Sequence, residues 1–600
     1  MNDFELLREY EPIACYTKGE AFYPTAVEEY IKDCSLWLTD PQGRDQILIP
    51  EGQLDVDHLA GYEEVPENYT LHLRFVEQPL DPLEYQRWLR NPFRERFVAP
   101  GRLARVPMVF RLADSFFDLS LFVRGRVPGD KAAAAEVKTR AIESRDQRRV
   151  YYGRVFRSGG WIALQYLFFF PMNNWRSGFF GVNDHEADWE QVFVFLAESG
   201  NGETEPQWVA YASHDFKGDD LRRRWDDPLL VREGNHPLVF VGAGSHASYF
   251  EQGEYLMGVE PGFLSPFKEG SARLRKFWKK TLGMGIGAEP QQSDKARLSV
   301  PFIDYARGDG RRIGPGQNEN WSPVIISDEV GWVHKYRGLW GLDTHDPLGG
   351  ERAPAGPKYN RDGTVRQSWY DPVGWAGLDK VYPTYELESE VYARLVSLKG
   401  EIEELSVEIE SQRDELRKRT LDVEALRVTQ YYDALRINKE EQLKTSQKEF
   451  QDLQLKKKEL LETVLGLDAY LKRLKRGDIG SPTAHLHHVH HPEPPLQPHD
   501  RAVEIWAAIS GALILLGIFM VLFLRPDYWF IWLIGFGVVI GAIENLVRGN
   551  LMNYLLTIVV ILAIIAAIIL LVEFWGWFLG LMLIGLVIFI ILGNLQELRR

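Results

Sequence analysis

Residues 181–190 read Gly181-Val-Asn-Asp-His-Glu-Ala-Asp-Trp-Glu190 and lead directly into the apolar run Gln191-Val-Phe-Val-Phe-Leu196. Another apolar run, Leu164-Gln-Tyr-Leu-Phe-Phe-Phe170, ends shortly before them. Aromatic and β-branched runs of this kind predict two strands, with the acidic stretch where a loop enters the second strand. Because side chains two apart in a strand point the same way, we expect Asp188 and Glu190 on one side and the tryptophan between them in the core.

His185 precedes the second strand and is expected to fold back onto the side that carries the two carboxylates. An imidazole and two carboxylates that converge would suit a divalent cation with positions left open for water or a ligand. The same residues also admit a simpler interpretation, a solvated acidic loop end that binds no metal.

The stretch His185-Glu-Ala-Asp-Trp-Glu190 resembles the later part of the GHRHDWE heptapeptide of the necrosis-inducing, NLP-type proteins. In that family the first His, the Asp and the Glu of the heptapeptide help to hold a divalent metal, together with an Asp from the preceding loop. By position, the resemblance implies four metal ligands: His185, Asp188, Glu190 and Asn173. The sequence departs from the family where Asp184 and Ala187 replace Gly and His, and where an Asn amide stands for the loop Asp. The cofactor implied is a divalent cation, Mg²⁺ or Ca²⁺.

A longer series of motifs is similar to the Vps62 family over residues 10–380. The motifs follow one another as Tyr166–Pro171, the acidic stretch, Gly242–Phe250, Gly338–Gly341, Ala355–Pro357 and Trp369–Pro372. This resemblance implies an antiparallel β-sandwich, and the dense short strands expected from residue 151 onward agree with it. We expect this domain at residues 1–383, with helical insertions such as residues 130–142, which are rich in helix formers.

Further candidates for contact with the ligand lie near strand ends or in the loop before the acidic stretch: His214, Asp215, His246 and Trp175. Glycines near His246 allow close approach of the backbone. A histidine at a strand end is more often a hydrogen-bonded structural residue, and this alternative stays open. A triad of Ser213, His214 and Asp215 is disfavoured, because triad members are seldom sequence neighbours.

Composition limits which binding partners and which cellular compartment are expected. The net charge of −15 has no long basic stripe to offset it and argues against nucleic acid. Two cysteines, Cys15 and Cys34, suit a reducing compartment, and no signal peptide is expected at the N-terminus. Basic residues at 267–281 alternate with aromatic ones, which suits acidic lipid head groups, although a solvated loop is the preferred interpretation.

Residues 384–477 are predicted to form a long α-helical coiled coil. Gly and Pro nearly vanish between residues 401 and 465, and apolar residues recur at spacings of three and four. The heptad phase slips near residues 428–442, which indicates either a stutter in a straight stalk or the turn of a hairpin. Because a long apolar stripe needs a partner, we expect homo-oligomerisation or folding back.

Residues 478–502 read as a linker rich in His and Pro. Its clustered histidines suit Zn²⁺ binding or a response to pH, although a low-complexity linker is preferred: His485, His487, His488, His490 and His491.

Residues 503–600 are predicted to be a transmembrane domain of about four helices. The expected spans are Ile505–Leu524, Tyr528–Ile543, Leu551–Val572 and Phe574–Gly593. Charges such as Glu544 lie only at span ends, which favours an anchor over a transport pathway. The distribution of Lys and Arg places the large N-terminal region and the C-terminus in the cytoplasm.

Together these features predict a membrane-anchored, cytoplasm-facing, metal-assisted binding module for a lipid or glycan head group. Membrane lipids and further copies of the chain are the expected partners, and membrane trafficking or organisation is the expected setting. One alternative is a metal-dependent hydrolase in which the cation activates water and His214 or His246 handles the proton. The other is a structural membrane scaffold. The non-enzymatic interpretation is preferred.

Overall fold

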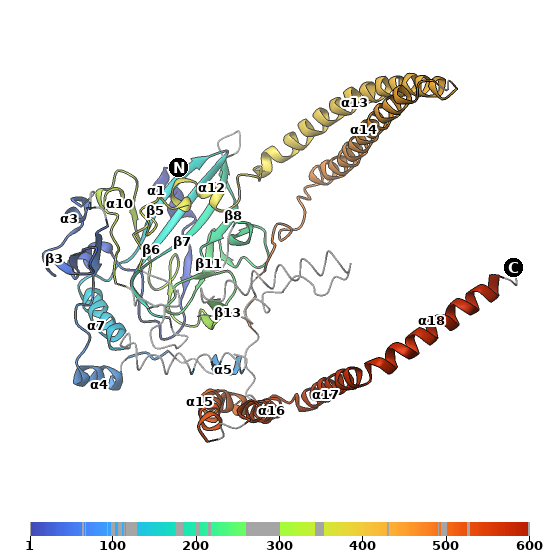
Figure 1. Ribbon diagram of the computed structural model, residues 1–600. Helices are drawn as coiled ribbons and strands as arrows, with labels where there is room; N and C mark the ends of the chain where they lie inside the picture. Colours follow the sequence, from blue (N-terminus) through green and yellow to red (C-terminus); the bar gives the residue numbers. More distant parts are fainter. Residues whose placement is uncertain are drawn as a thin grey trace.

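The strands on either side of the acidic stretch lie in the middle of a six-stranded sheet in the computed structural model (Figure 1). β6 (Trp161–Asn173) pairs antiparallel with β7 (His185–Glu198), and Phe170 lies opposite Asp188. The sheet order is β16-β5-β6-β7-β8-β9, in which β16 and β5 run parallel to each other. Its other strands are β5 (Arg149–Ser158), β8 (Thr204–Tyr211), β9 (Arg222–Arg224) and β16 (Trp321–Ile325).

The structure describes residues 2–597 with gaps. The gaps are residues 63–64, 67, 93, 98–101, 106–107, 109–110, 113–114, 116–128, 176–183, 199–203, 214–217, 260–299, 343–352, 429–430, 490, 494–500 and 525–527. The candidates His214, Asp215 and His490 and the basic segment 267–281 lie outside the described residues.

Among the described residues, three smaller open sheets belong to the β-rich N-terminal region. The first has the order β10-β11-β1-β15, with β12 paired to β11. Its strands are β10 (Arg232–Glu233), β11 (His236–Val241), β1 (Ile13–Cys15), β15 (Arg312–Ile313) and β12 (Ser248–Tyr249). The second pairs β13 (Gly253–Val259) with β14 (Val300–Ala306). The third has the order β3-β2-β4: β3 (Asp45–Ile49), β2 (Ser35–Thr39) and β4 (Thr70–Arg74).

Short helices precede, separate and follow these strands. They are α1 (Asp3–Glu9), α2 (Val27–Lys32), α3 (Val56–Ala60), α4 (Pro82–Arg90), α5 (Arg102–Arg105), η2 (Gly218–Leu221), α10 (Gly331–His334), α11 (Gln367–Tyr370) and α12 (Pro372–Trp375). The longest helix of this region, α7 (Gly129–Arg145), confirms the helical insertion expected at residues 130–142.

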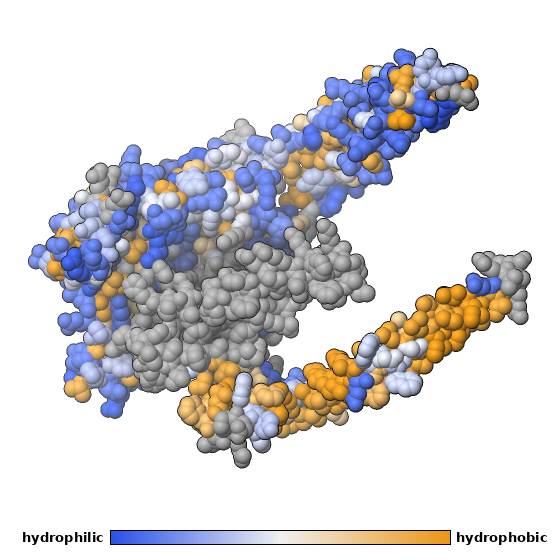
Figure 2. Space-filling view, viewed as in Figure 1, coloured by the Kyte–Doolittle hydropathy of each residue, from blue (hydrophilic) through white to orange (hydrophobic). Residues whose placement is uncertain are grey.

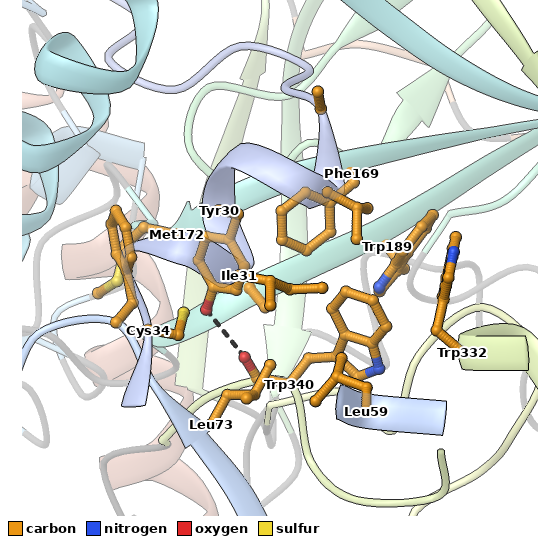
Figure 3. Close-up of a cluster of buried hydrophobic side chains, with 14 of the residues drawn as sticks. Tyr30, Ile31, Cys34, Leu59, Leu73, Phe169, Met172, Trp189, Trp332 and Trp340 are labelled. Atoms are coloured by element: carbon orange, nitrogen blue, oxygen red, sulfur yellow. Dashed lines mark hydrogen bonds between the residues drawn. The ribbon is translucent and has the colours of Figure 1, made fainter. Parts of the chain in front are cut away.

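The central strands are buried on both faces because their side chains alternate between two apolar clusters. Tyr166 belongs to one cluster, whereas Phe169 and Trp189 belong to the other. Figure 3 shows Trp189 beside Phe169 and Trp340, with ring centroids 5.1 and 5.4 Å away. In the same cluster the hydroxyl of Tyr30 donates to the carbonyl oxygen of Trp340 at 2.8 Å. Trp189 therefore lies in the core, as the strand pattern predicted.

Two long helices follow and pack against each other as a hairpin (Figure 1). α13 (Thr384–Arg427) and α14 (Asp433–Leu474) bring Leu395 and Leu471 into one apolar cluster near their open end. The turn falls inside the predicted phase slip at residues 428–442. The chain therefore folds back, and apolar residues of the two helices pack together near the open end.

The linker after the hairpin lies against the edge of the six-stranded sheet. The Nε2 atom of His485 lies 3.0 Å from the carbonyl oxygen of Arg222 in the edge strand β9. The backbone N–H of Glu493 donates to the carbonyl oxygen of Glu254 in β13 at 2.7 Å.

The described residues of the C-terminal part form four helices long and apolar enough to cross a membrane. They are α15 (Arg501–Leu524), α16 (Trp529–Val547), α17 (Leu551–Glu573) and α18 (Trp575–Glu597). Figure 2 shows hydrophobic residues almost continuously along α17 and α18, whereas the hairpin is mostly hydrophilic. A helix that is apolar on all sides suits a lipid environment, so these helices can anchor the chain in a membrane.

Candidate functional site

The ladder between β6 and β7 lacks one residue pair near the acidic stretch, Pro171 with Ala187. The register is the same on either side of this pair: Phe170 lies opposite Asp188 and Asn173 lies opposite His185. Proline has no N–H to donate to the ladder, and Ala187 has a positive φ of 58°. The ladder is thus interrupted between Glu186 and Asp188 without a change of register.

Asp188 is the centre of a buried polar group that includes residues distant in the sequence. Its Oδ2 atom accepts from the Nδ1 atom of His246 at 2.8 Å and from the Nδ2 atom of Asn173 at 3.3 Å. All three residues are buried. They come from β7, from β6 and from the loop after β11, so the tertiary structure joins two predicted metal ligands to one predicted ligand-binding residue.

His246 is held firmly in this position. Its ring stacks on Phe170 with centroids 3.8 Å apart and planes at 3°, and its backbone φ is +57°. Its Nε2 atom is buried and has no hydrogen-bond partner among the described residues. This atom faces the carboxylate of Glu20, whose Oε1 atom lies 3.9 Å away.

Glu20 completes the group and was not anticipated from the sequence. Its Oε1 atom accepts from the backbone N–H groups of Ala21 and Phe22, and its Oε2 atom accepts from that of Gly244. It therefore ties the N-terminal segment to the loop that carries His246. No local motif marks this glutamate, because its partner loop lies 224 residues away. Glu20, Asn173, Asp188 and His246 are called the Asp188 cluster below.

The other predicted ligands lie in different surroundings. The Nδ1 atom of His185 contacts the carbonyl oxygen of Ala187 at 2.7 Å. Glu190 is partly exposed and interacts electrostatically with Arg366, where burial lowers the pKa of the guanidinium and the carboxylates of Glu190 and Asp188 oppose the shift. Trp175 is buried in an apolar cluster. Within the described residues, no set of three or more His, Cys, Asp or Glu side chains is grouped to hold a metal ion.

Glu186, within the same acidic stretch, has a structural role. It is fully buried and accepts hydrogen bonds from the backbone N–H groups of Phe75, Val76 and Leu342, and its carboxylate lies 3.1 Å from the Nζ atom of Lys131. These hydrogen bonds satisfy a buried carboxylate and tie β7 to the segments at residues 75–76 and 342. The acidic stretch therefore contains both a structural carboxylate and the candidate site.

One family model matches part of the β-rich region. Residues 134–241 match the family model described as necrosis inducing protein (NPP1), which supports the resemblance seen in the heptapeptide. The matched segment contains Asn173, His185, Asp188 and Glu190, whereas Glu20 and His246 lie outside it. Searches of curated proteins and of solved structures returned no match. The wider similarity to Vps62 proteins stays a prediction.

Proposed function

We propose that the β-rich region is a membrane-anchored binding module for a lipid or glycan head group, in which the Asp188 cluster binds the ligand with the help of a divalent cation. The observation that supports this most directly is the Nε2 atom of His246, which is buried and faces the carboxylate of Glu20. Four apolar helices that can enter a membrane keep such a module near lipid head groups.

The chemistry of His246 explains why a cation would suit this place. Because its Nδ1 atom donates to Asp188, a neutral ring presents a lone pair at Nε2. That lone pair and the Oε1 atom of Glu20 are both electron-rich and lie 3.9 Å apart. Ligand bonds of about 2.0–2.6 Å to an ion between them would be compatible with this separation.

The set of residues that would hold the ion therefore differs from the set expected from the sequence. His246 and Glu20 would contact the ion, and Asp188 would orient the imidazole from its other nitrogen, as carboxylates commonly do for metal-binding histidines. When bound, the ion would supply positive charge to oxygen atoms of a head group. An imidazole ligand also suits transition metals, so Mg²⁺ and Ca²⁺ should be compared with Zn²⁺ and Mn²⁺.

Three finer features belong to the same proposal. The open sheets of residues 1–383 would pack as an antiparallel sandwich of the NLP or Vps62 kind. The helical hairpin would be an antiparallel coiled coil through which copies of the chain associate. The β-rich region would face the cytoplasm, because Lys and Arg flank the membrane helices on that side.

A metal and stability measurement tests the proposal on the full chain in detergent micelles. We expect a stoichiometric divalent ion in the wild type, a lower melting temperature after chelation, and loss of both effects in Asp188→Asn and His246→Asn. Glu11→Gln, a change at a buried carboxylate outside the cluster, should keep them. Wild-type protein without metal and without a chelator effect would contradict the cation. Vesicles of defined head groups and a glycan panel then test ligand binding, and turnover of esters or phosphodiesters would instead indicate the hydrolase.

A structural scaffold is the second candidate function. The helical hairpin and the four apolar helices favour it, because they form a large part of the chain without contributing to the Asp188 cluster. If the protein is a scaffold, Asp188→Asn should leave its effect on membranes unchanged. If it is a metal-assisted binding module, the same variant should lose head-group binding, and this difference separates the two candidates.

A further inference from the structure

Glu544 lies in α16, within a segment apolar enough to span a membrane, yet its side chain is buried and densely hydrogen-bonded. Its carboxylate accepts from the guanidinium groups of Arg111 and Arg548 and from the Nε1 atom of Trp506 at 2.6 Å. A carboxylate in this environment is costly without a partner and marks a functional contact. Arg548 and Trp506 belong to or adjoin the membrane helices, whereas Arg111 comes from the N-terminal region.

The contact around Arg111 extends beyond one ion pair. The Nη1 atom of Arg111 donates to the hydroxyl of Ser510 in α15 at 2.6 Å. The Nη2 atom of Arg548 donates to the carbonyl oxygen of Ala104 in α5 at 2.8 Å. Figure 1 shows α5 beside the first two membrane helices, in agreement with the contacts between α5 and α15.

One face of α15 allows the N-terminal segment to come into close contact with the helix. Its fully covered positions are spaced by three and four residues, which places them on a single helix face: Ala507, Ser510, Gly511 and Ile514. A Cβ atom added to Gly511 would lie 2.2 Å from the hydroxyl oxygen of Ser115 and 2.8 Å from the carbonyl oxygen of Arg111. Glycine at this position therefore allows the N-terminal segment to lie directly on the helix.

We infer that α5, Arg111 and Ser115 dock onto α15 and α16 as a further membrane-associated contact and hold the β-rich region against these helices independently of the linker. The occupant of this surface is thus a segment of the chain itself. Its contacts lie in the first half of α15, at Ser510 and Gly511, and near the end of α16, at Glu544. The start of α15 and the end of α16 lie on the membrane face where the linker enters, so these positions are approached from that face.

Arg111 and Glu544 suit this contact because each supplies the opposite charge that the other needs at a position removed from water. Arg111 is 1% exposed and Glu544 is 7% exposed. A guanidinium group can donate to a carboxylate and to a neighbouring hydroxyl at once. The inference does not depend on a ligand in the Asp188 cluster, and it extends the proposed function by fixing the distance between that cluster and the bilayer.

A cleavage experiment on the full chain in mild detergent tests the docking. A protease site inserted within residues 494–500 lies after the linker contact of Glu493, so cleavage leaves the hairpin and the linker on the N-terminal fragment. We expect the two fragments to remain together on size exclusion after cleavage. Gly511→Leu should reduce the retained fraction by about tenfold through overpacking. Gly535→Leu is the matched control, because nothing lies within 4 Å of a Cβ atom at that position.

Arg111→Leu tests the same contact from the N-terminal side and leaves the sequence of the membrane helices unchanged, should Gly511→Leu fail to fold. It should also release the fragment, whereas Arg87→Leu on the exposed helix α4 should not. Separation of the wild-type fragments would overturn the inference. So would retention of both the Gly511→Leu and the Arg111→Leu fragments, because it would show attachment through another surface.

Discussion

In the β-rich region Asp188 accepts hydrogen bonds from an imidazole and an amide, whereas at the membrane helices Glu544 accepts them from two arginines and a tryptophan. Arginine stays charged at every physiological pH. The carboxylate of Glu544 is therefore balanced by the protein itself, which suits a permanent contact. Asp188 has no arginine among its described hydrogen-bond donors, although Arg366 interacts with it electrostatically, and a second carboxylate, that of Glu20, lies beyond the imidazole. The two carboxylates and the free imidazole nitrogen are balanced less directly than Glu544 is, which suits an added cation.

Removing the carboxylate of the Glu544 cluster should have the largest effect on stability. Glu544→Leu leaves the buried guanidinium of Arg111 without its counter-ion, which should cost about 3–5 kcal/mol of unfolding free energy. The double variant Arg111→Leu/Glu544→Leu should recover much of this loss, because only the partly exposed Arg548 then lacks the carboxylate. Denaturant unfolding in detergent micelles measures both variants. Equal stability of Glu544→Leu and wild type would show that Arg111 does not need Glu544 as its counter-ion.

Glu11 is another buried carboxylate. Its burial changes its pKa more than its hydrogen-bond partners do. Burial raises the pKa of Glu11 to about 7, although hydrogen bonds from Tyr151 and Arg8 oppose the shift. The folded protein therefore holds this proton more tightly than the unfolded chain does. The resulting stability is present below about pH 4.5 and is lost as the pH rises to about 7.

The loss across this window should be at most about 3 kcal/mol. Unfolding measured at a series of pH values should therefore show a downward slope for the wild type between pH 4.5 and 7. Glu11→Gln should lack the contribution of this group to the slope. An unchanged slope in that variant would show that other groups cause it.

Asp188→Asn should have a smaller effect in the absence of metal. The substitution weakens the hydrogen bond to His246 without opening a cavity and should cost about 1–3 kcal/mol. If a cation binds, the difference between wild type and variant should grow when the ion is added and shrink after chelation. Thermal unfolding with and without chelator measures this difference. A constant difference would show that Asp188, like Glu544, is balanced by the protein without an added cation.

The smallest effect is expected where the linker meets η2. The carboxylate of Asp220 accepts from the backbone N–H groups of His487 and His488 and lies 3.1 Å from the Nδ1 atom of His488. Because this contact is exposed to solvent, Asp220→Asn should change stability by less than about 1 kcal/mol. It should nevertheless speed hydrogen exchange at the two amides. Unchanged exchange would mean that the amides are protected by something other than this carboxylate.

Much of the architecture followed from local patterns. The apolar spans, the strands on either side of the acidic stretch and the helix at residues 130–142 depend on periodicity and composition over short windows. The phase slip at residues 428–442 likewise indicated where the hairpin turns. Trp189 faced the core because side chains alternate along a strand. The domain boundaries and the orientation in the membrane stay predictions.

The contacts that define both carboxylate clusters depended on tertiary structure. His246 lies 58 residues from Asp188, and Arg111 lies 433 residues from Glu544. No periodicity connects such pairs, because their meeting depends on strand register and on helix packing elsewhere in the chain. The same holds for His485, which composition placed in a low-complexity linker but which the structure places against the edge of a sheet. The sequence by itself indicated the strands on either side of the acidic stretch, the two paired helices and the apolar C-terminal helices, because these follow from neighbouring side chains. Only the tertiary structure decided which buried charges meet, because a charge removed from water is stabilised by whatever partner the fold brings to it.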